Sequence, residues 1–460
     1  MHAFHVEIVE HAAHLLAHRL RSNVQPVGYF LLGHAIEYRK NDLLRFYTEQ
    51  VSQVLKLAQR ERIPVTPRGA GSGLSGGCTP LHGGIVLDMK RMGRILEINR
   101  RNMSARVEAG VVLADFHRAV KKQGLFYPPD PGSQAVSTLG GNVAENAGGL
   151  RGLKYGVTRD YVMGLDFFDV DGEAIKTGSR TVKCATGYNL AGLLVGSEGT
   201  LGIFNRITLK LIPLPAAQRA MVAVFDQAER ASETVSAIIA SHIVPATLEF
   251  MDNFTIRAVE DYSHVGLPVD AAALLLIEVD GHPAQVQEDA ERVEALCRQH
   301  GAASIRVARD AAERTKVWEA RRSALSALAK LKPTLVLEDA TVPRSKIPAM
   351  VAAIGGISRE YRLSIGTFGH AGDGNLHPTI LTDKRDKEEW ERVEQAIAAI
   401  FDRALALGGT LSGEHGTGIA KACFLEKETS PATILYSQRI KKALDPNNIL
   451  NPGKIIAAAA

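Results

Sequence analysis

Apolar and polar residues along the first half of the chain form short segments that predict both strands and helices. Runs rich in β-branched and aliphatic residues predict strands at residues 63–65, 85–89, 106–109, 162–170 and 203–212. Apolar residues at helical spacing predict helices at residues 49–60 and 113–123. Two prolines, Pro213 and Pro215, follow the last of these strands and favour a domain boundary there.

The second half has a different order, in which a strand, a helix and a strand follow one another twice. The first unit is predicted at residues 220–225, 228–241 and 247–252, and the second at residues 272–281, 286–299 and 303–308. This order is typical of a ferredoxin-like split sheet with helices on one face. We therefore expect an α+β protein with an unmatched segment at 1–45, one domain at 46–215, a ferredoxin-like domain at 216–430 and a C-terminal segment at 431–460 that returns to the first domain.

Composition and charge exclude several classes of protein. The 460 residues are 45% hydrophobic and 23% charged, which is typical of a globular protein and not of a disordered or fibrous one. The net charge is +4 without a block of basic residues, so nucleic acid is not an expected partner. No apolar run reaches the ~18 residues of a membrane span. The four scattered cysteines form neither a disulfide framework nor an iron–sulfur motif, which favours the reducing cytoplasm.

Glycine is concentrated between residues 68 and 202, in four clusters. Glycine lets a ligand approach the backbone closely, so the clusters favour a long, phosphate-bearing ligand held by main-chain amides. The segment Gly71 to Gly76 fits the pattern GxGxxG, but the Pro80 and glycines that follow it cannot begin a helix. This loop is therefore expected to hold a pyrophosphate without a Rossmann helix; a hairpin loop without a ligand is the alternative.

Two later glycine-rich loops carry histidines. His370 and His377 flank a Gly-Asp-Gly-Asn turn, so a loop or hairpin is expected to bring both imidazoles to one side. Glu414 and His415 add a carboxylate and a third imidazole. Two histidines and one glutamate form a three-ligand metal set, and the remaining histidine would be a base. The alternative is that these histidines only form hydrogen bonds.

The motifs PVTPRGAGSGLSGG, YPPDPGS, TLGGNVAENAGGLRGLKYG, GSEGTLGI and NPGK resemble the FAD-linked oxidase family of the vanillyl-alcohol oxidase/p-cresol methylhydroxylase fold. GHAGDGNLHP and SGEHGTG resemble its D-2-hydroxy-acid dehydrogenase branch, which includes D-lactate dehydrogenases. EDATVPRSKIP resembles the flavin-bearing D subunit of bacterial glycolate oxidases. The resemblance covers about residues 49–454. It implies that residues 46–215 are a two-lobed FAD-binding domain and residues 216–430 a substrate-binding cap.

The resemblance also implies FAD that is bound non-covalently, because Ser72 stands where relatives with covalent flavin often carry a histidine. The residues implied to bind FAD are Pro67, Arg68, Gly69, Ala70, Gly71, Ser72, Gly73, Leu74, Ser75, Pro131, Gly132, Ser133, Thr138, Gly140, Gly141, Asn142, Gly148, Gly149, Tyr155, Gly156, Glu198, Gly202, Ile203 and Asn451.

In the same branch, the positions of His370, His377 and Glu414 bind a divalent metal, commonly zinc, and that of His415 accepts a proton. Arg321 matches the arginine that binds the substrate carboxylate, and its neighbour Arg322 is the alternative. The hydroxyglutarate-oxidising members carry a lysine where this chain has Leu337, which favours a shorter substrate here.

The predicted function is FAD-dependent oxidation of glycolate or D-lactate to the 2-oxo acid. Three alternatives are a D-2-hydroxyglutarate dehydrogenase-like enzyme, a non-catalytic FAD-binding subunit of a larger oxidase, and a metal-dependent hydrolase that uses the same histidines. The chain has no iron–sulfur motif of its own. The resemblance therefore implies flavin or iron–sulfur partner subunits, or a quinone or cytochrome acceptor, and membrane association only through such partners. A homodimer is left open.

Overall fold

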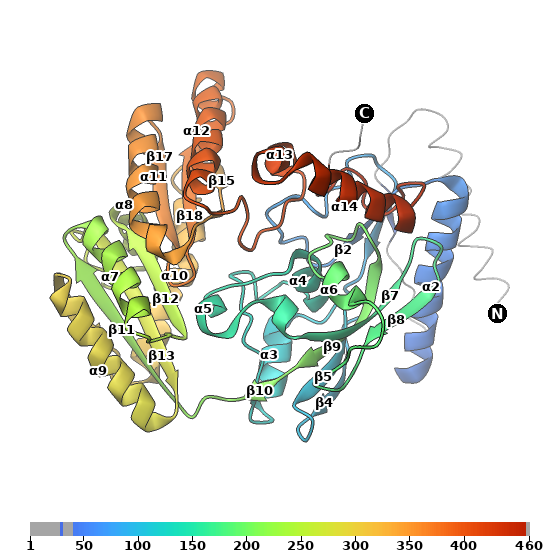
Figure 1. The fold of residues 1–460 in the computed structure, drawn as a ribbon, viewed down its shortest axis with the longest axis horizontal. Helices are drawn as coiled ribbons and strands as arrows, with labels where there is room; N and C mark the ends of the chain where they lie inside the picture. The colour runs from blue at the N-terminus through green and yellow to red at the C-terminus, as the bar shows by residue number, and fades with distance from the viewer. Residues whose placement is uncertain (1–27, 31–39, 457–460) are drawn as a thin grey trace.

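The computed structural model describes residues 28–30 and 40–456, which form two lobes (Figure 1). The first lobe contains the elements up to β10 (Ile212–Pro213), and the second begins with β11 (Ala217–Phe225). Within the described residues, no helix is both long enough and apolar enough to cross a membrane.

The first lobe contains a small parallel sheet in the order β1-β3-β2, formed by Gly28–Phe30, Ile85–Asp88 and Val65–Arg68. Helix α2 (Lys40–Glu61) packs on it through Val51, Leu55 and Ala58. This helix begins at Lys40 and not at residue 49 as predicted, and β1 lies in a segment where no element was predicted. Ile449 and Leu450, near the C-terminus, join the same core.

A second, antiparallel sheet in this lobe has the order β4-β5-β9-β7-β8. Its strands are Ile95–Asn99, Ser104–Glu108, Ile203–Lys210, Val162–Phe168 and Ala174–Gly178. The shorter elements of the lobe are α3 (Leu113–Lys121), β6 (Leu125–Phe126), α4 (Leu139–Glu145), α5 (Gly152–Tyr155), η1 (Thr158–Asp160) and α6 (Leu190–Leu194). Buried side chains such as Phe116, Leu139 and Ile207 join α3 and α4 to the sheet in one hydrophobic core.

The second lobe is built on an eight-stranded sheet in the order β14-β11-β13-β12-β17-β18-β15, with β16 paired to β18. Strands β11, β12 (Thr247–Asp252), β13 (Ala273–Gly281) and β14 (Ala302–Val307) form its ferredoxin-like half, because two strand-helix-strand units interleave there in the order 4-1-3-2. The sheet continues with β15 (Thr334–Leu337), β16 (Ala340–Thr341), β17 (Ser364–His370) and β18 (Asn375–Thr382).

The two helices predicted within the strand-helix-strand units lie on one face of this sheet as expected, but the structure adds further helices and these cover the other face as well. Four helices share one core: α7 (Ala228–Ala240), α9 (Pro283–Gln299), α11 (Ile347–Tyr361) and α12 (Lys387–Ala406). Helices α8 (Asn253–Ser263) and α10 (Ala311–Leu328) pack on the other face. The physical reason is that the central strands are apolar on both sides: every residue of β18 is buried, whereas a sheet covered on one face would expose alternate residues.

After α12 the chain crosses back toward the first lobe, where α13 (Leu425–Glu428) and α14 (Pro431–Leu444) lie (Figure 1). Two short 3-10 helices lie in the second half of the chain: η2 (Arg344–Lys346) directly precedes α11, and η3 (Ala422–Phe424) directly precedes α13. The backbone N–H of Val65 donates to Ile449 over 2.8 Å, and that of Asn451 donates to Val65 over 2.8 Å. The C-terminal segment is therefore hydrogen-bonded to the strand that leads into the first glycine-rich loop.

Candidate active site

A cavity of about 380 Å³ is lined by residues of both lobes. Its first-lobe wall comes from the glycine-rich segments around residues 67–78, 131–148 and 198–202. Its second-lobe wall consists of Arg321, Arg322, Leu325, Ser326, Leu337, Phe368, His370, His377, Glu414 and His415. The structure thus brings the predicted cofactor-binding segments and the predicted catalytic and metal-binding residues to one space.

Most of the residues predicted to bind FAD line this cavity. They are Pro67, Arg68, Gly69, Ala70, Gly71, Ser72, Gly73, Leu74, Pro131, Gly132, Ser133, Thr138, Gly140, Gly141, Asn142, Gly148, Glu198 and Gly202. The cavity does not reach Ser75, Gly149, Tyr155, Gly156, Ile203 or Asn451.

Several of these six residues support the cavity wall from behind. The Tyr155 hydroxyl donates to Asp280 of β13 over 2.7 Å, so it joins the two lobes. Asn451 donates from Nδ2 to the carbonyl oxygens of Gly77 and Glu198, at 2.8 and 2.6 Å. Ile203 belongs to the core between α2 and the parallel sheet. For these three residues a supporting role explains the geometry better than direct contact with a ligand.

The first glycine-rich loop has the predicted form, since no helix begins between residues 69 and 84. Gly69 packs so closely against Thr138 that a Cβ atom there would overlap Thr138 Oγ1. Thr138 Oγ1 in turn accepts from the backbone N–H of Gly141 over 3.2 Å and caps α4. Asn142 Nδ2, a buried donor on the same wall, has no hydrogen-bond partner among the described residues. A glycine-lined wall with a free donor suits a dinucleotide with its phosphates.

The histidines lie on a hairpin formed by β17 and β18, where a loop or a hairpin was predicted. His370 ends β17 and His377 lies in β18. In the pairing of these two strands, Phe368 lies opposite His377 and His370 lies opposite Asn375. Glu414 Oε1 lies 3.0 Å from His370 Nε2 and 3.4 Å from His377 Nε2. The hairpin therefore turns both imidazoles toward the loop that carries Glu414.

The donor set suits a divalent metal. The ligand atoms of His370, His377 and Glu414 all lie within 4.8 Å of one another. The other ring nitrogen of His370, Nδ1, lies 2.8 Å from a carboxylate oxygen of Glu249. A carboxylate on one ring nitrogen directs the other toward a metal, as in many zinc sites. These three residues therefore have the identity and spacing of a three-ligand metal site.

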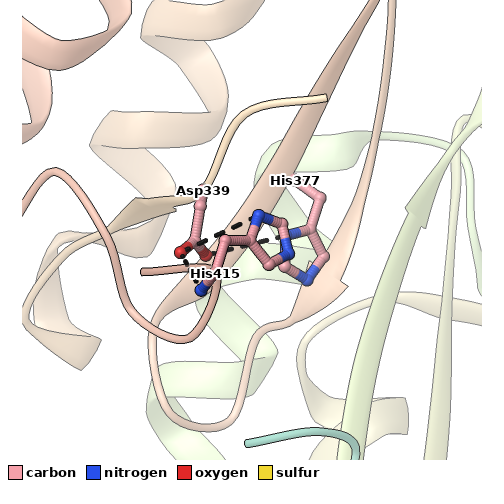
Figure 2. A group of neighbouring side chains, drawn as sticks. All are labelled: Asp339, His377 and His415. Carbon is pink, nitrogen blue, oxygen red and sulfur yellow. Dashed lines mark hydrogen bonds and ion pairs between the residues drawn. The ribbon is translucent and has the colours of Figure 1, made fainter. Parts of the chain in front are cut away.

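His415 lies beside this set, and Asp339 connects it with His377 (Figure 2). The rings of His377 and His415 stack with centroids 5.1 Å apart and planes 12° from parallel. Asp339 is fully buried, and its Oδ2 accepts from the backbone N–H groups of Glu414 and His415, each over 3.0 Å. Its carboxylate oxygens also lie 3.8 Å from His377 Nδ1 and 3.9 Å from His415 Nδ1. Asp339 therefore fixes the position of the loop that carries the candidate base.

The electrostatics of the cluster give Glu414 and His415 the protonation states that their different roles require. Although burial opposes it, the charge of His370 holds the pKa of Glu414 well below its usual value, so this carboxylate is ionised. Burial lowers the pKa of His415 to about 4, against a smaller opposing effect of Asp339. A neutral imidazole can accept a proton, so His415 is in the form that a general base requires at neutral pH.

Glu249 and Asp339 are functional candidates that the sequence analysis missed. Glu249 accepts from Arg321 Nε over 2.6 Å in addition to its contact with His370. Both carboxylates are fully buried. One feature of the sequence could have indicated Glu249. It interrupts an otherwise apolar predicted strand, and a charge that is buried in a strand is seldom present without a partner.

The two neighbouring arginines differ in how they are held. Arg321 is buried, with its guanidinium carbon 4.7 Å from the centroid of Phe368. Arg322 also lines the cavity but forms no hydrogen bond or ion pair with any described residue. Both guanidinium groups are available to an anionic ligand, and the choice of Arg321 stays a prediction.

Family profiles match two parts of the chain. The profile described as "FAD binding domain" matches residues 47–178, and that described as "FAD linked oxidases, C-terminal domain" matches residues 214–455. The chain belongs to the FAD-linked oxidase family. Among relatives, the glycolate oxidase subunit GlcD of Bacillus subtilis is 52% identical over 413 residues, covering 90% of this chain and 88% of its own. A D-lactate dehydrogenase of Anaerostipes hadrus is 37% identical over 422 residues, covering 89% and 87%.

Solved structures of this family's fold agree with the architecture. p-Cresol methylhydroxylase with bound substrate matches with a TM-score of 0.72 at 18% identity, covering 89% of this chain and 87% of its own. A 4-ethylphenol oxidase from Gulosibacter chungangensis matches with the same TM-score at 19% identity, covering 89% and 88%. The predicted fold, an FAD-binding domain of the vanillyl-alcohol oxidase type with a cap, is confirmed.

Proposed function

We propose that the protein oxidises a small 2-hydroxy acid, glycolate or D-lactate, to the 2-oxo acid with non-covalent FAD and a divalent metal, zinc by preference. The observation that carries this proposal is the meeting of two walls in one cavity, one rich in glycine and one carrying His370, His377, Glu414 and His415. The names of two relatives, a glycolate oxidase subunit and a D-lactate dehydrogenase, support the substrate class.

Five residues of the second-lobe wall have a part in this reaction. Arg321 binds the substrate carboxylate, since a guanidinium suits a carboxylate in a bidentate arrangement. His415 accepts the hydroxyl proton on Nε2, because its Nδ1 faces Asp339. His370, His377 and Glu414 hold the metal, which when bound lowers the pKa of the substrate hydroxyl. The first-lobe wall holds FAD, which when bound accepts the hydride from the substrate carbon.

The size of the substrate follows from Leu337, which lines the cavity as an apolar side chain. A second carboxylate would meet no cation at that position, so we propose a short acid in preference to 2-hydroxyglutarate. We propose non-covalent FAD because the loop at residues 68–77 carries Ser72 at the place where relatives with covalent flavin often have a histidine. We further propose that electrons leave through a partner subunit, consistent with the relative that is named a subunit.

The test is anaerobic mixing of the FAD-loaded protein with glycolate, D-lactate, L-lactate and D-2-hydroxyglutarate while the flavin absorbance is followed. We expect glycolate or D-lactate to bleach the flavin faster than the other acids. Bleaching by D-2-hydroxyglutarate alone would establish the longer substrate instead. A flavin that none of the four acids reduces would contradict the proposed function and favour a non-catalytic FAD-binding subunit.

A further inference from the structure

Glu249 divides its two carboxylate oxygens between the two functional parts of the second-lobe wall. Oε1 lies 2.8 Å from His370 Nδ1, and Oε2 accepts from Arg321 Nε over 2.6 Å. The side chain is fully buried, so water cannot replace either contact. One carboxylate thus connects a candidate metal ligand to the candidate substrate-binding arginine.

The surrounding fold leaves this carboxylate little freedom to move. Glu249 lies on β12, which pairs with β17 through Phe250 opposite Gly369, one residue before His370. Phe368 of the same strand lies beneath the guanidinium of Arg321. A displacement of Glu249 therefore shifts both His370 and Arg321, and a ligand that fixes one of them helps to fix the other.

We propose that Glu249 is a positioning residue that couples metal binding to substrate-carboxylate binding, an inference that rests on the proposed function. By accepting from His370 Nδ1, it leaves Nε2 directed toward Glu414 and an ion between them. By accepting from Arg321 Nε, it holds the plane of the guanidinium and leaves the terminal nitrogens for the substrate. Such coupling is reciprocal, so metal and carboxylate must each tighten the binding of the other by the same factor.

Glu249→Gln removes the connection with little change in size. An amide has one oxygen that accepts hydrogen bonds and an NH2 group that only donates, so both contacts cannot survive while His370 keeps its proton on Nδ1 and leaves Nε2 free for a metal. The matched control is Glu278→Gln on the neighbouring strand β13. Glu278 is also buried and accepts from Trp318 Nε1 over 2.8 Å, but it does not line the cavity.

The experiment measures zinc affinity of the oxidised, FAD-loaded protein by calorimetry, without and with saturating pyruvate, the 2-oxo acid of lactate. In the parent protein we expect pyruvate to tighten zinc binding by about fivefold or more. In Glu249→Gln we expect zinc to bind ~10–100-fold more weakly, and pyruvate to change its affinity less than about twofold. Glu278→Gln should keep both parental values.

Glu249→Asp serves as a second variant if Glu249→Gln does not fold, because it keeps the negative charge beside buried Arg321 but is too short to reach both partners. FAD content and circular dichroism establish that each variant is folded. Parental coupling in a folded variant overturns the role of Glu249. A parent protein that binds neither zinc nor pyruvate overturns the proposed function together with this inference.

Discussion

The two walls of the cavity are built by different means. The first-lobe wall uses main chain and glycine, as at Gly69, where even a Cβ atom would overlap Thr138. The second-lobe wall uses ionisable side chains from α10, from the hairpin of β17 and β18, and from the loop that carries Glu414 and His415. The buried carboxylates of Glu249 and Asp339 hold these groups from behind the wall. The difference between the two walls indicates that a large cofactor can be bound through the main chain. Proton transfer and ion binding instead require charged side chains that other charged side chains hold in place.

The first test, with the largest expected effect, asks whether the second-lobe wall performs the chemistry while the first-lobe wall only binds the cofactor. Replacing the candidate base in His415→Ala should slow anaerobic flavin reduction by ~10²–10⁴, because proton transfer from the hydroxyl loses its acceptor. FAD content should not change. Stopped-flow absorbance measures the rate, and His282→Gln, at an exposed histidine outside the cavity, is the control. A variant that reduces its flavin at the parental rate would remove His415 from the mechanism.

The next test asks whether the first lobe tolerates charge in its interior. Burial lowers the pKa of His117 to about 4, and its ring nitrogens lie near Gln134 Oε1 and the carbonyl oxygen of Pro129, behind the Pro131 segment. The folded state binds this proton less readily than the unfolded state does. The free energy of unfolding should therefore fall by up to about 3 kcal/mol as the pH is lowered from 6.5 to 4.

Urea unfolding at several pH values measures this slope, and His117→Gln should flatten it. Equal slopes for the two proteins would mean that His117 is not the group whose protonation destabilises the first lobe.

A third test adds a single carbon atom to the first-lobe wall. In Gly69→Ala the new Cβ displaces Thr138 Oγ1 from its capping position on α4, which costs about 1 kcal/mol of stability. We expect FAD affinity to fall by about tenfold as well, measured by fluorescence titration of the apoprotein. Gly356→Ala, in the open on α11, should leave FAD affinity unchanged and raise stability by about 0.5–1 kcal/mol. Parental FAD affinity in Gly69→Ala would show that close backbone packing here is not required.

The smallest effect alters specificity. Leu337→Lys places a cation at the cavity wall, where a second substrate carboxylate would lie under the proposed function. We expect the ratio of kcat/KM for D-2-hydroxyglutarate over that for D-lactate to rise by about tenfold, or ~1.4 kcal/mol of transition-state binding. Leu337→Met is the neutral control. A ratio that moves equally in both variants would assign the change to packing instead of charge.

The two walls also differ in how far the sequence predicts them. The loop from Arg68 to Gly77 was predicted because its glycines and the strand before it are contiguous, so a local pattern describes the whole feature. The histidine hairpin was predicted for the same reason, since His370 and His377 flank one turn. Local patterns also gave the ferredoxin-like order of β11 to β14.

What the sequence analysis missed depends on contacts between distant segments. Glu249 precedes His370 by 121 residues, and only the pairing of β12 with β17 brings them together. The same pairing extends the sheet beyond its ferredoxin-like half. Helix α10 on the second face could not be predicted either, because strands buried on both sides lose the alternation that reports which face is covered.

The most direct test of the central claim, that both walls serve one reaction, is a crystal structure of the protein loaded with FAD, zinc and pyruvate. We expect the flavin against the first-lobe wall and zinc on the Nε2 atoms of His370 and His377 and on Glu414, with pyruvate between the flavin and the ion. A zinc ion bound elsewhere, or a flavin ring that faces away from these residues, would contradict it.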